Sequence, residues 1–281
     1  MDPAAPATEA PTPQGGDVVY RHRLGVRLAH WINAVAIFCL LMSGLMIFNA
    51  HPMLYWGSYG ANFDRPVLKI GSEGARGYLR IGDLEVTTTG VLGLWRDGDG
   101  QLQRRAFPGW ATIPSRYSLA DGRLWHFFFA WVLAGGVLFY ATFALLDRKR
   151  RRDLWPTRAE LRPRHIWRDI ADHARLRFPT GAAAARYNVL QKLSYVAVMF
   201  GALPVIILTG LTMSPALNAA WPWLLDLFGG RQSARTIHFI AAMLIALFIV
   251  VHLLMVLLAG PANELRSMIT GRYRLPTARA A

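Results

Sequence analysis

The chain has 281 residues, is 53% hydrophobic and carries a formal net charge of +14. Its mean hydropathy of +0.26 is high for a soluble domain, and several long apolar runs indicate an integral membrane protein. Basic residues cluster beside these runs, where topology and anionic lipid account for them, so nucleic acid is not an expected partner. The single cysteine, Cys39, excludes an intrachain disulfide, c-type haem attachment and a cysteine-ligated iron–sulfur cluster.

The chain begins with a segment that we expect to be a disordered tail. Residues 1–19 are rich in Pro and Ala and lack the positive n-region of a signal peptide. A membrane domain is expected over 20–260. Its first span is predicted at 28–48, with His30 one turn inside.

An aqueous insertion follows at 49–122. It holds eight Arg or Lys against seven Asp or Glu between positions 50 and 122, so its charge is nearly balanced. The stretches 84–89 and 91–95 predict strands, and 96–100 predicts a turn. His51 is expected to be a solvated loop residue.

The second span is predicted at 124–146, with His126 one turn inside. A polar cytoplasmic loop is expected at 147–189, because positions 147–186 carry twelve Arg or Lys against five acids. Its residues 159–176 are typical of an amphipathic surface helix. The loop histidines, His165 and His173, are expected to be solvated.

The third span is predicted at 190–213 and contains no histidine; Pro204 is expected to kink it. Its sequence LTGLTM at 208–213 is similar to LMSGLM at 41–46, which hints that the first and third spans are related. A short amphipathic link at 218–230 leads to the fourth span.

The fourth span, 235–258, carries two histidines, and a cytoplasmic tail is expected at 261–281. His238 and His252 are fourteen residues apart, which is about 21 Å of helical rise and nearly four turns, so both lie on one face. Ionisable side chains inside a membrane are functional candidates by default, although each could be a structural histidine bonded to a neighbouring helix.

The basic residues also predict the orientation of the spans. The approach to the first span, the loop at 147–189 and the tail at 261–281 are rich in Arg, whereas 49–122 and 214–234 are balanced or nearly uncharged. The positive-inside rule then places both termini in the cytoplasm of a bacterial inner membrane and the insertion in the periplasm.

Orientation gives each membrane histidine a depth. His126 and His238 begin helices that enter from the periplasm, so they are expected to form one pair near that face. His30 and His252 are expected to form a second pair near the cytoplasmic face.

Three of these histidines follow an arginine by three residues, at Arg27, Arg123 and Arg235. Each arginine is one turn nearer water on the same helix face. Haem suits this pattern, because imidazoles from two helices bind its iron and arginines pair with its propionates. Arginine also snorkels at helix starts without any ligand. Zinc fits less well, since each level offers two histidines and no carboxylate or thiolate.

Several glycines lie within the predicted spans. Their missing side chains would leave room for such a ligand between the helices, or would serve ordinary helix packing. They are Gly44, Gly135, Gly136, Gly201 and Gly210.

These residues resemble a known family: the di-haem b-type cytochromes that are membrane subunits of nickel–iron hydrogenases, formate dehydrogenases and thiosulfate reductases, within the bacterial cytochrome b561 superfamily. The likeness covers the four spans. It rests on RLAHW at 27–31, RLWHF at 123–127 and the H-x13-H of the last span.

The resemblance implies two haem b groups, with His30/His252 and His126/His238 as axial ligands. It also implies electron exchange with membrane quinone and a periplasmic redox partner, such as a molybdenum enzyme or a hydrogenase. Simpler members have a short connection in place of 49–122, so this insertion is the candidate docking region.

We therefore predict an all-α membrane protein, a four-transmembrane-helix bundle whose periplasmic insertion contains some β structure. It would be an electron-transfer subunit between quinone and a periplasmic redox protein. Two alternatives are a stand-alone quinone oxidoreductase and a haem-free anchor or transporter. Polar candidates for a quinone site are Asn33, Tyr187, Asn188, Gln191 and Lys192.

Overall fold

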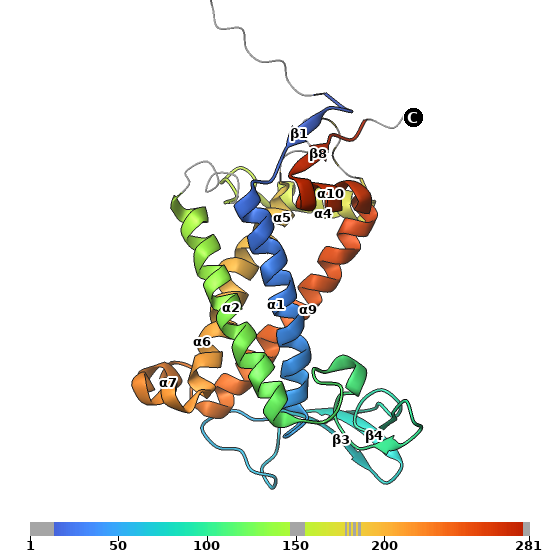
Figure 1. Ribbon diagram of the computed structural model, residues 1–281, viewed down its shortest axis with the longest axis vertical. Coiled ribbons are helices and arrows are strands. Elements are labelled where there is room, and N and C mark those ends of the chain that lie inside the picture. The colour runs from blue at the N-terminus through green and yellow to red at the C-terminus, as the bar shows by residue number, and fades with distance from the viewer. Residues whose placement is uncertain are drawn as a thin grey trace, which may run out of the picture. The chain divides into compact units, whose positions relative to one another are not determined.

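The computed structural model describes residues 14–146, 155–177, 179, 181, 184 and 187–277. Within this part of the chain, four helical segments are long and apolar enough to cross a membrane, as predicted. They are Leu24–Phe48, Leu119–Thr142, Val189–Met213 and Arg231–Ala259. The first is α1, the second is most of α2 (Leu119–Leu146), and the last is α9 (Figure 1).

The third span is built from three helical pieces. α5 (Val189–Val196) is followed by a π-helical segment, Ala197–Ala202, and then by α6 (Leu203–Met213). Pro204 lies at the start of α6. Since proline lacks an amide hydrogen and clashes with the preceding turn, the wider π turns remove the conflict that an α-helix would have there. The irregularity expected at Pro204 is therefore present, as a change of helix type before it.

The chain divides into two compact units, and α1, α2 and α9 contribute to both. Unit 1 comprises Met1–Leu28, Ala144–Val196 and Val251–Ala281. Unit 2 comprises Ala29–Phe143 and Ala197–Val250.

The helical core of unit 2 draws on four helices. Its buried residues come from α1, α2, α6 and α9, and they are Ala36, Leu133, Val137, Leu203 and Ile245. Ala36 is completely buried, and its small side chain lets neighbouring helices approach closely. Because each helix satisfies its own backbone groups, side-chain packing of this kind is what holds a membrane bundle together.

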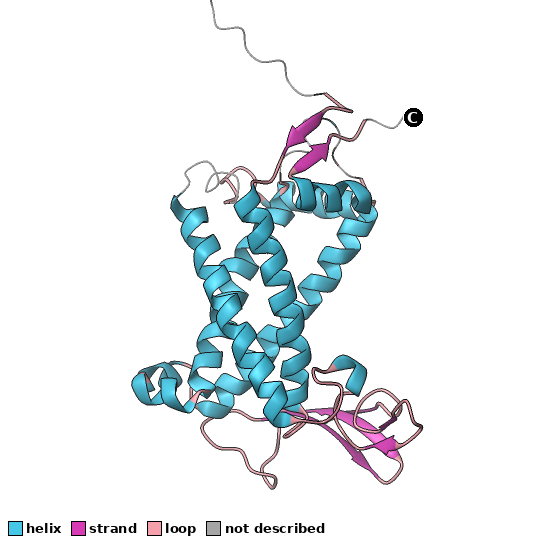
Figure 2. Ribbon diagram, viewed as in Figure 1, coloured by secondary structure: helices cyan, strands magenta, loops and turns pink. Residues whose placement is uncertain are grey.

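The predicted insertion contains a four-stranded antiparallel sheet in the order β2 (Met53–Leu54), β3 (Leu68–Glu73), β4 (Arg76–Ile81), β5 (Leu84–Thr87), shown in magenta in Figure 2. A two-stranded ribbon, β6 (Trp95–Arg96) with β7 (Leu102–Gln103), and a short 3-10 helix, Gly109–Ala111, complete it. Ile70 pairs with Leu79 across β3 and β4.

One strand prediction in the insertion is wrong. Residues 84–87 do form a strand, but 91–94 form a turn and bends, and only Trp95 of the second stretch lies in a strand. The segment folds back over the sheet: Gly93 has φ of +77°, and a Cβ there would lie 2.0 Å from the Gly71 carbonyl oxygen. Only glycine fits so close an approach to another backbone.

The link between the third and fourth spans forms two short helices, α7 (Pro215–Ala220) and α8 (Pro222–Leu227). Both belong to unit 2.

Unit 1 gathers residues from both ends of the described chain. β1 (Val18–Tyr20) pairs antiparallel with β8 (Arg272–Arg274), and Val19 stands opposite Tyr273. Helices α4 (Pro163–Ala174) and α10 (Pro261–Thr270) belong to the same unit (Figure 1).

The segments predicted as tails and as a polar loop contain regular secondary structure. The expected surface helix at 159–176 is α4, and the expected C-terminal tail contains α10 and β8. Strand β1 begins within the segment predicted as a disordered tail. Residues 1–13 of that tail and the basic run 147–152 lie outside the described residues.

Candidate functional site

Two of the four membrane histidines meet in unit 2. His126 lies about two turns into α2 and His238 about two turns into α9. The centres of their rings are 6.2 Å apart, with their planes at 60°. Both side chains are partly buried. This is the pair that the orientation argument expected near one membrane face.

The distance between the two rings can be compared with that required by a shared metal. An iron bound about 2.0 Å from one nitrogen of each ring would place the ring centres roughly 6.3 Å apart, since each centre lies about 1.1–1.2 Å behind its nitrogen. The observed 6.2 Å matches this value. Two neutral imidazoles are also a donor set that haem iron accepts, so His126 and His238 would fit this group.

Helix α1 supplies the immediate surroundings of His126. The hydroxyl Oγ of Ser43 lies 3.1 Å from Nδ1 of His126, and Ser43 is fully buried. A Cβ added at the next residue, Gly44, would stand 3.4 Å from Cε1 of the same ring. The absent side chain at Gly44 therefore lets the imidazole lie against the α1 backbone.

Helix α6 places a hydroxyl residue and a glycine next to His238, as α1 does next to His126. Thr209 Oγ1 lies 3.1 Å from Nδ1 of His238, and Thr209 is fully buried. A Cβ added at Gly210 would stand 3.3 Å from Cε1 of His238. In both cases a hydroxyl residue followed by glycine holds a histidine through Nδ1, which leaves Nε2 as the nitrogen for a metal.

These contacts give a physical meaning to the similarity between 41–46 and 208–213. Both stretches contain a hydroxyl residue followed by Gly and Leu, Ser43-Gly44-Leu45 in the first and Thr209-Gly210-Leu211 in the second, one position earlier in its stretch. Each dipeptide contacts the histidine that opens the next spanning helix. Ser43 and Thr209 were not singled out from sequence, although the similarity of these stretches was the signal that could have identified them.

The other pair is divided between the units. His30 lies on α1 within unit 2, where its ring meets that of Trp31 edge to face at 5.2 Å. His252 lies on α9 within unit 1. The pairing of His30 with His252 therefore stays a prediction.

Two of the arginines predicted to pair with propionates, Arg235 and Arg123, contact other parts of the protein. Arg235 donates hydrogen bonds to the backbone carbonyls of Met53, at 2.6 Å, and of His51. Arg123 lies over the ring of Phe127, 5.7 Å from its centre. Arg235 thus attaches the start of the insertion to α9, a role that competes with binding a propionate.

In unit 1, Arg27 donates to the carbonyl of Ile269 in α10. This contact joins the first turn of α1 to α10, so Arg27 also has a structural role.

His51 is more enclosed than a solvated loop residue. Its ring stacks on Tyr55 with centres 5.9 Å apart, and its carbonyl accepts the bond from Arg235. Burial and the nearby positive charge of Arg235 lower the pKa of His51, so its imidazole is neutral at pH 7.

Of the remaining glycines, Gly136 marks a close approach of two helices, whereas Gly135 and Gly201 face open space. A Cβ at Gly136 would meet the side-chain oxygen of Asn33 at 2.2 Å, so α1 and α2 approach closely there. Gly135 and Gly201 have no atom within 4 Å of an added Cβ.

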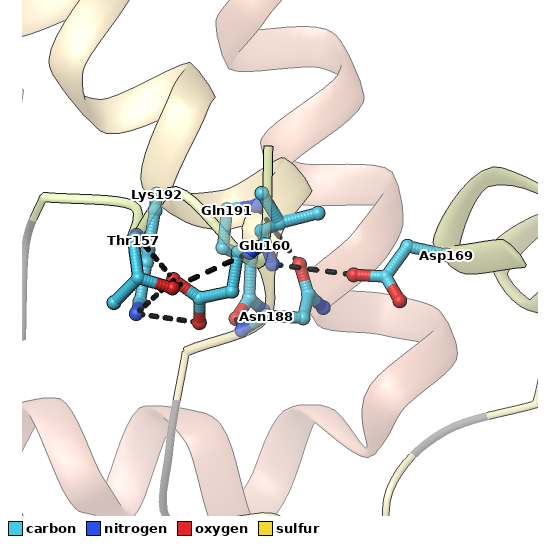
Figure 3. A network of polar contacts seen from close by, with 7 residues as sticks. Thr157, Glu160, Asp169, Asn188, Gln191 and Lys192 are labelled. Atoms are coloured by element: carbon cyan, nitrogen blue, oxygen red, sulfur yellow. Dashed lines mark hydrogen bonds and ion pairs between the residues drawn. The ribbon is translucent and has the colours of Figure 1, made fainter. Parts of the chain in front are cut away.

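Three of the quinone candidates belong to a polar network at the start of α5 (Figure 3). The buried ammonium group of Lys192 bonds both carboxylate oxygens of Glu160, at 2.8 and 3.1 Å. The backbone amide of Asn188 donates to the Gln191 side chain, and that of Gln191 donates to Asn188, which caps the helix.

The network extends to α4. Asp169 accepts from the amide of Val189, at 3.2 Å, and Asn188 lies 3.2 Å from Nε2 of His173. His173 is therefore held between elements, unlike the solvated residue predicted. Tyr187, another quinone candidate, packs edge to face with Tyr195, 5.4 Å between ring centres.

The charge state of Glu160 follows from its bonds. Burial raises the pKa of this carboxyl, but hydrogen bonds from Lys192 and Thr157 outweigh burial and hold the pKa below its ordinary value. Glu160 and Lys192 therefore form an ion pair at neutral pH.

Among the described residues, no group of three or more His, Cys, Asp or Glu is placed to hold a metal ion. A two-imidazole site does not need such a group.

Comparison with known proteins identifies the family. The family model described as prokaryotic cytochrome b561 matches residues 21–271. A protein of Azospira oryzae named putative protein-methionine-sulfoxide reductase subunit YedZ1 is 28% identical over 250 residues, which are 89% of this chain and 96% of that protein. The chain therefore belongs to the prokaryotic cytochrome b561 family, whose members are membrane electron-transfer cytochromes b.

Proposed function

We propose that this protein relays electrons through two b haems between membrane quinone and a periplasmic redox protein. The observation that carries the proposal is the pair of imidazoles 6.2 Å apart, each held through Nδ1 by a buried hydroxyl. The family already implies haem b binding. The number of haems, the quinone and the side on which the partner binds are our own inference.

The residues have separate tasks in this proposal. His126 and His238 hold one haem, and His30 and His252 hold the other. A haem bound in this way accepts and releases single electrons, at a potential set by its ligands and their hydrogen bonds. We assign Arg123 to a propionate, because the guanidinium groups of Arg27 and Arg235 donate to backbone carbonyls.

The orientation follows from charge. The Arg-rich segments belong to the cytoplasmic side by the positive-inside rule, so His126 and His238 serve the periplasmic haem. The insertion then faces the periplasm, where it offers a folded surface to a partner. The polar residues around Lys192 are on the cytoplasmic side, where we place the quinone.

A separate catalytic subunit is the partner that we favour. The printed name of the Azospira oryzae protein describes it as a reductase subunit, and the two sequences match over nearly their whole lengths. By analogy, this chain would exchange electrons with a soluble oxidoreductase subunit. Purification with a periplasmic protein would support this, whereas full quinone-linked turnover by the purified chain alone would support the stand-alone alternative.

The first test is a reduced-minus-oxidised visible spectrum, with haem quantified per chain. We expect two low-spin b haems in the unmodified protein and one in His238→Ala, with a matched control, His165→Ala, keeping two. Two haems in His238→Ala would show that this ligand assignment is wrong. Unmodified protein that contains no haem, when made with sufficient haem supply, would favour the haem-free anchor or transporter.

A further inference from the structure

Ser43 and Thr209 hold the same relation to two different histidines, and the direction of their hydrogen bonds can be worked out. Ser43 Oγ lies 2.6 Å from the Cys39 carbonyl oxygen, four residues earlier in α1. Thr209 Oγ1 lies 2.7 Å from the Val205 carbonyl oxygen, four residues earlier in α6. A carbonyl oxygen only accepts, so each hydroxyl proton is directed to its own helix.

This leaves each hydroxyl oxygen as an acceptor toward the histidine. A hydroxyl has one proton, so the 3.1 Å contacts to His126 and His238 use a proton on Nδ1 of the imidazole. Each imidazole also hydrogen-bonds a backbone carbonyl, that of Leu40 for His126 and that of Ile206 for His238, so the hydroxyl is one of two acceptors on its helix. In a neutral ring with Nδ1 protonated, Nε2 carries the lone pair that binds a metal. The two helices therefore select the ligating tautomer of both rings.

We propose that Ser43 and Thr209 are a matched pair of positioning residues that lower the reduction potential of the haem at His126 and His238. The inference rests on the proposed function. A ligating histidine whose other nitrogen donates to an acceptor is oriented and made more basic, and a more basic ligand favours the oxidised iron. Both hydroxyls are fully buried, so water does not compete for the bond.

Sequence and geometry make the pair symmetric. The two residues occupy equivalent positions before a glycine, and their distances to Nδ1 are the same, 3.1 Å. We therefore expect the two substitutions to act independently and to a similar extent on one haem, while the haem at His30 and His252 keeps its potential.

The test uses variants that remove each hydroxyl with little change in volume. Ser43→Ala and Thr209→Val are compared with the unmodified protein by redox titration of each haem. We expect each to raise the equilibrium constant for one-electron reduction of one haem by roughly threefold to tenfold, or about 30–60 mV, since a tenfold change corresponds to 59 mV. In the double variant, the shift in reduction potential should equal the sum of the two single shifts.

Two controls make the result specific. The Thr142 hydroxyl also donates to the carbonyl four residues earlier, that of Leu138, at 2.8 Å, but Thr142 is exposed on α2. Thr142→Val should therefore leave the reduction potentials of both haems unchanged. Thr209→Ser keeps the hydroxyl and should restore the original potential. His238→Ala identifies which titration belongs to this pair.

A second measurement does not depend on electron transfer. The low-temperature EPR spectrum of the oxidised protein reports the orientation and the basicity of the axial imidazoles. We expect the signal of one haem to change in Ser43→Ala and Thr209→Val, and to return in Thr209→Ser. Loss of one haem from both hydroxyl-free variants, with both haems kept in Thr142→Val and Thr209→Ser, would also support a positioning role.

Full haem content with unchanged potentials and EPR signals in both hydroxyl-free variants would overturn the inference. That outcome differs from failure of the proposed function, in which the unmodified protein itself binds no haem.

Discussion

At the scale of single residues, the space beside each imidazole depends on a missing side chain. Gly44 and Gly210 each place helix backbone next to a histidine ring. A Cβ added at Gly44 would stand 3.4 Å from Cε1 of His126, and one added at Gly210 would stand 3.3 Å from Cε1 of His238. The 3.3 Å contact at Gly210 is tight enough that the ring of His238 would have to shift by a few tenths of an ångström, whereas 3.4 Å at Gly44 is at the limit of ordinary contact. Because both imidazoles must also keep their bonds to a buried hydroxyl, the rings have little freedom to move.

We predict that Gly210→Ala weakens haem binding at His238, because its added Cβ would stand 3.3 Å from Cε1 of that ring. Overpacking of this kind disfavours the native arrangement by about 1–3 kcal/mol, because the ring must leave its preferred position. Haem content per chain, and the midpoint potential of the remaining haem, measure the effect. The matched control is Gly135→Ala on α2, where no atom lies within 4 Å of the new Cβ; equal haem loss in this control would contradict the explanation.

At the scale of elements, the insertion is fastened to the first turns of α9. Besides the bonds from Arg235, Thr236 Oγ1 donates to the Tyr55 carbonyl at 2.6 Å, and Ser233 Oγ accepts from the Gly57 amide at 2.7 Å. Phe48 stacks on Phe239 at 4.7 Å between ring centres. The insertion is thus joined to the helix that carries His238.

We predict that Arg235→Ala loosens this attachment. Loss of hydrogen bonds from a charged group leaves two carbonyls without their donor and destabilises the region by roughly 2–3 kcal/mol. Hydrogen exchange at the amides of residues 53–57 should become faster. Arg123→Ala, in the arginine three residues before His126, should leave this exchange unchanged.

The same pair of variants distinguishes the two roles of Arg235. If Arg235→Ala removed haem while exchange at 53–57 stayed slow, the arginine would serve the ligand rather than the attachment.

Several elements were predictable from sequence for identifiable reasons. Long apolar runs determine the spans, because a bilayer requires about 20 such residues. The meeting of His126 and His238 followed from the direction of their helices. The bend at 91–94 was not predictable, since its apolar residues suit a strand and the contact of Gly93 with Gly71 is made by residues distant in sequence.

The hydroxyls beside the histidines illustrate a different difficulty. Ser43 and Thr209 bond their own helix, which is an ordinary structural explanation for such residues in an apolar span. Their second contact, to a histidine on another helix, becomes visible only in three dimensions. Likewise, Arg235 had the spacing of a ligand-binding residue, but its bonds are to the backbone of the insertion.

At the scale of the whole molecule, each unit combines residues that are far apart in the chain. In unit 1, the ion pair between Glu160 and Lys192 connects the segment before α4 to the start of the third span, and Asp169 adds a second bond from α4 itself. These contacts hold the surface helix by polar bonds, and their strength therefore depends on pH.

We predict that α4 loosens in acid. Because the pKa of Glu160 is lowered by folding, its contribution is fully present above the ordinary glutamate value of about 4.3 and is lost as pH falls through the lowered pKa. Hydrogen exchange of 163–174, corrected for intrinsic rates, should rise across this acidic range. Glu160→Gln should show faster exchange at pH 7 and a weaker dependence on pH.

A control in the other unit tests whether this effect is local. Hydrogen bonds from Arg80 and Arg76 outweigh desolvation and lower the pKa of Glu85, which lies in the insertion. Glu85→Gln should leave exchange in α4 unchanged at every pH. An equal effect of both substitutions would show that α4 responds to overall charge instead.

The pairing of β1 with β8 has a consequence for how the protein is made. β1 leaves the ribosome before any span, and its partner strand follows only after all four have been synthesised. Arg21 lies 4.5 Å from the ring centre of Tyr273 and pairs with Glu264 at 3.5 Å, so these two contacts also form only after the fourth span has been made. Its contact with Tyr187, 5.6 Å from the ring centre, needs the chain only as far as the start of the third span. Chains released before β8 would leave β1 as an unpaired edge, a feature that distinguishes unfinished copies from finished ones in the membrane.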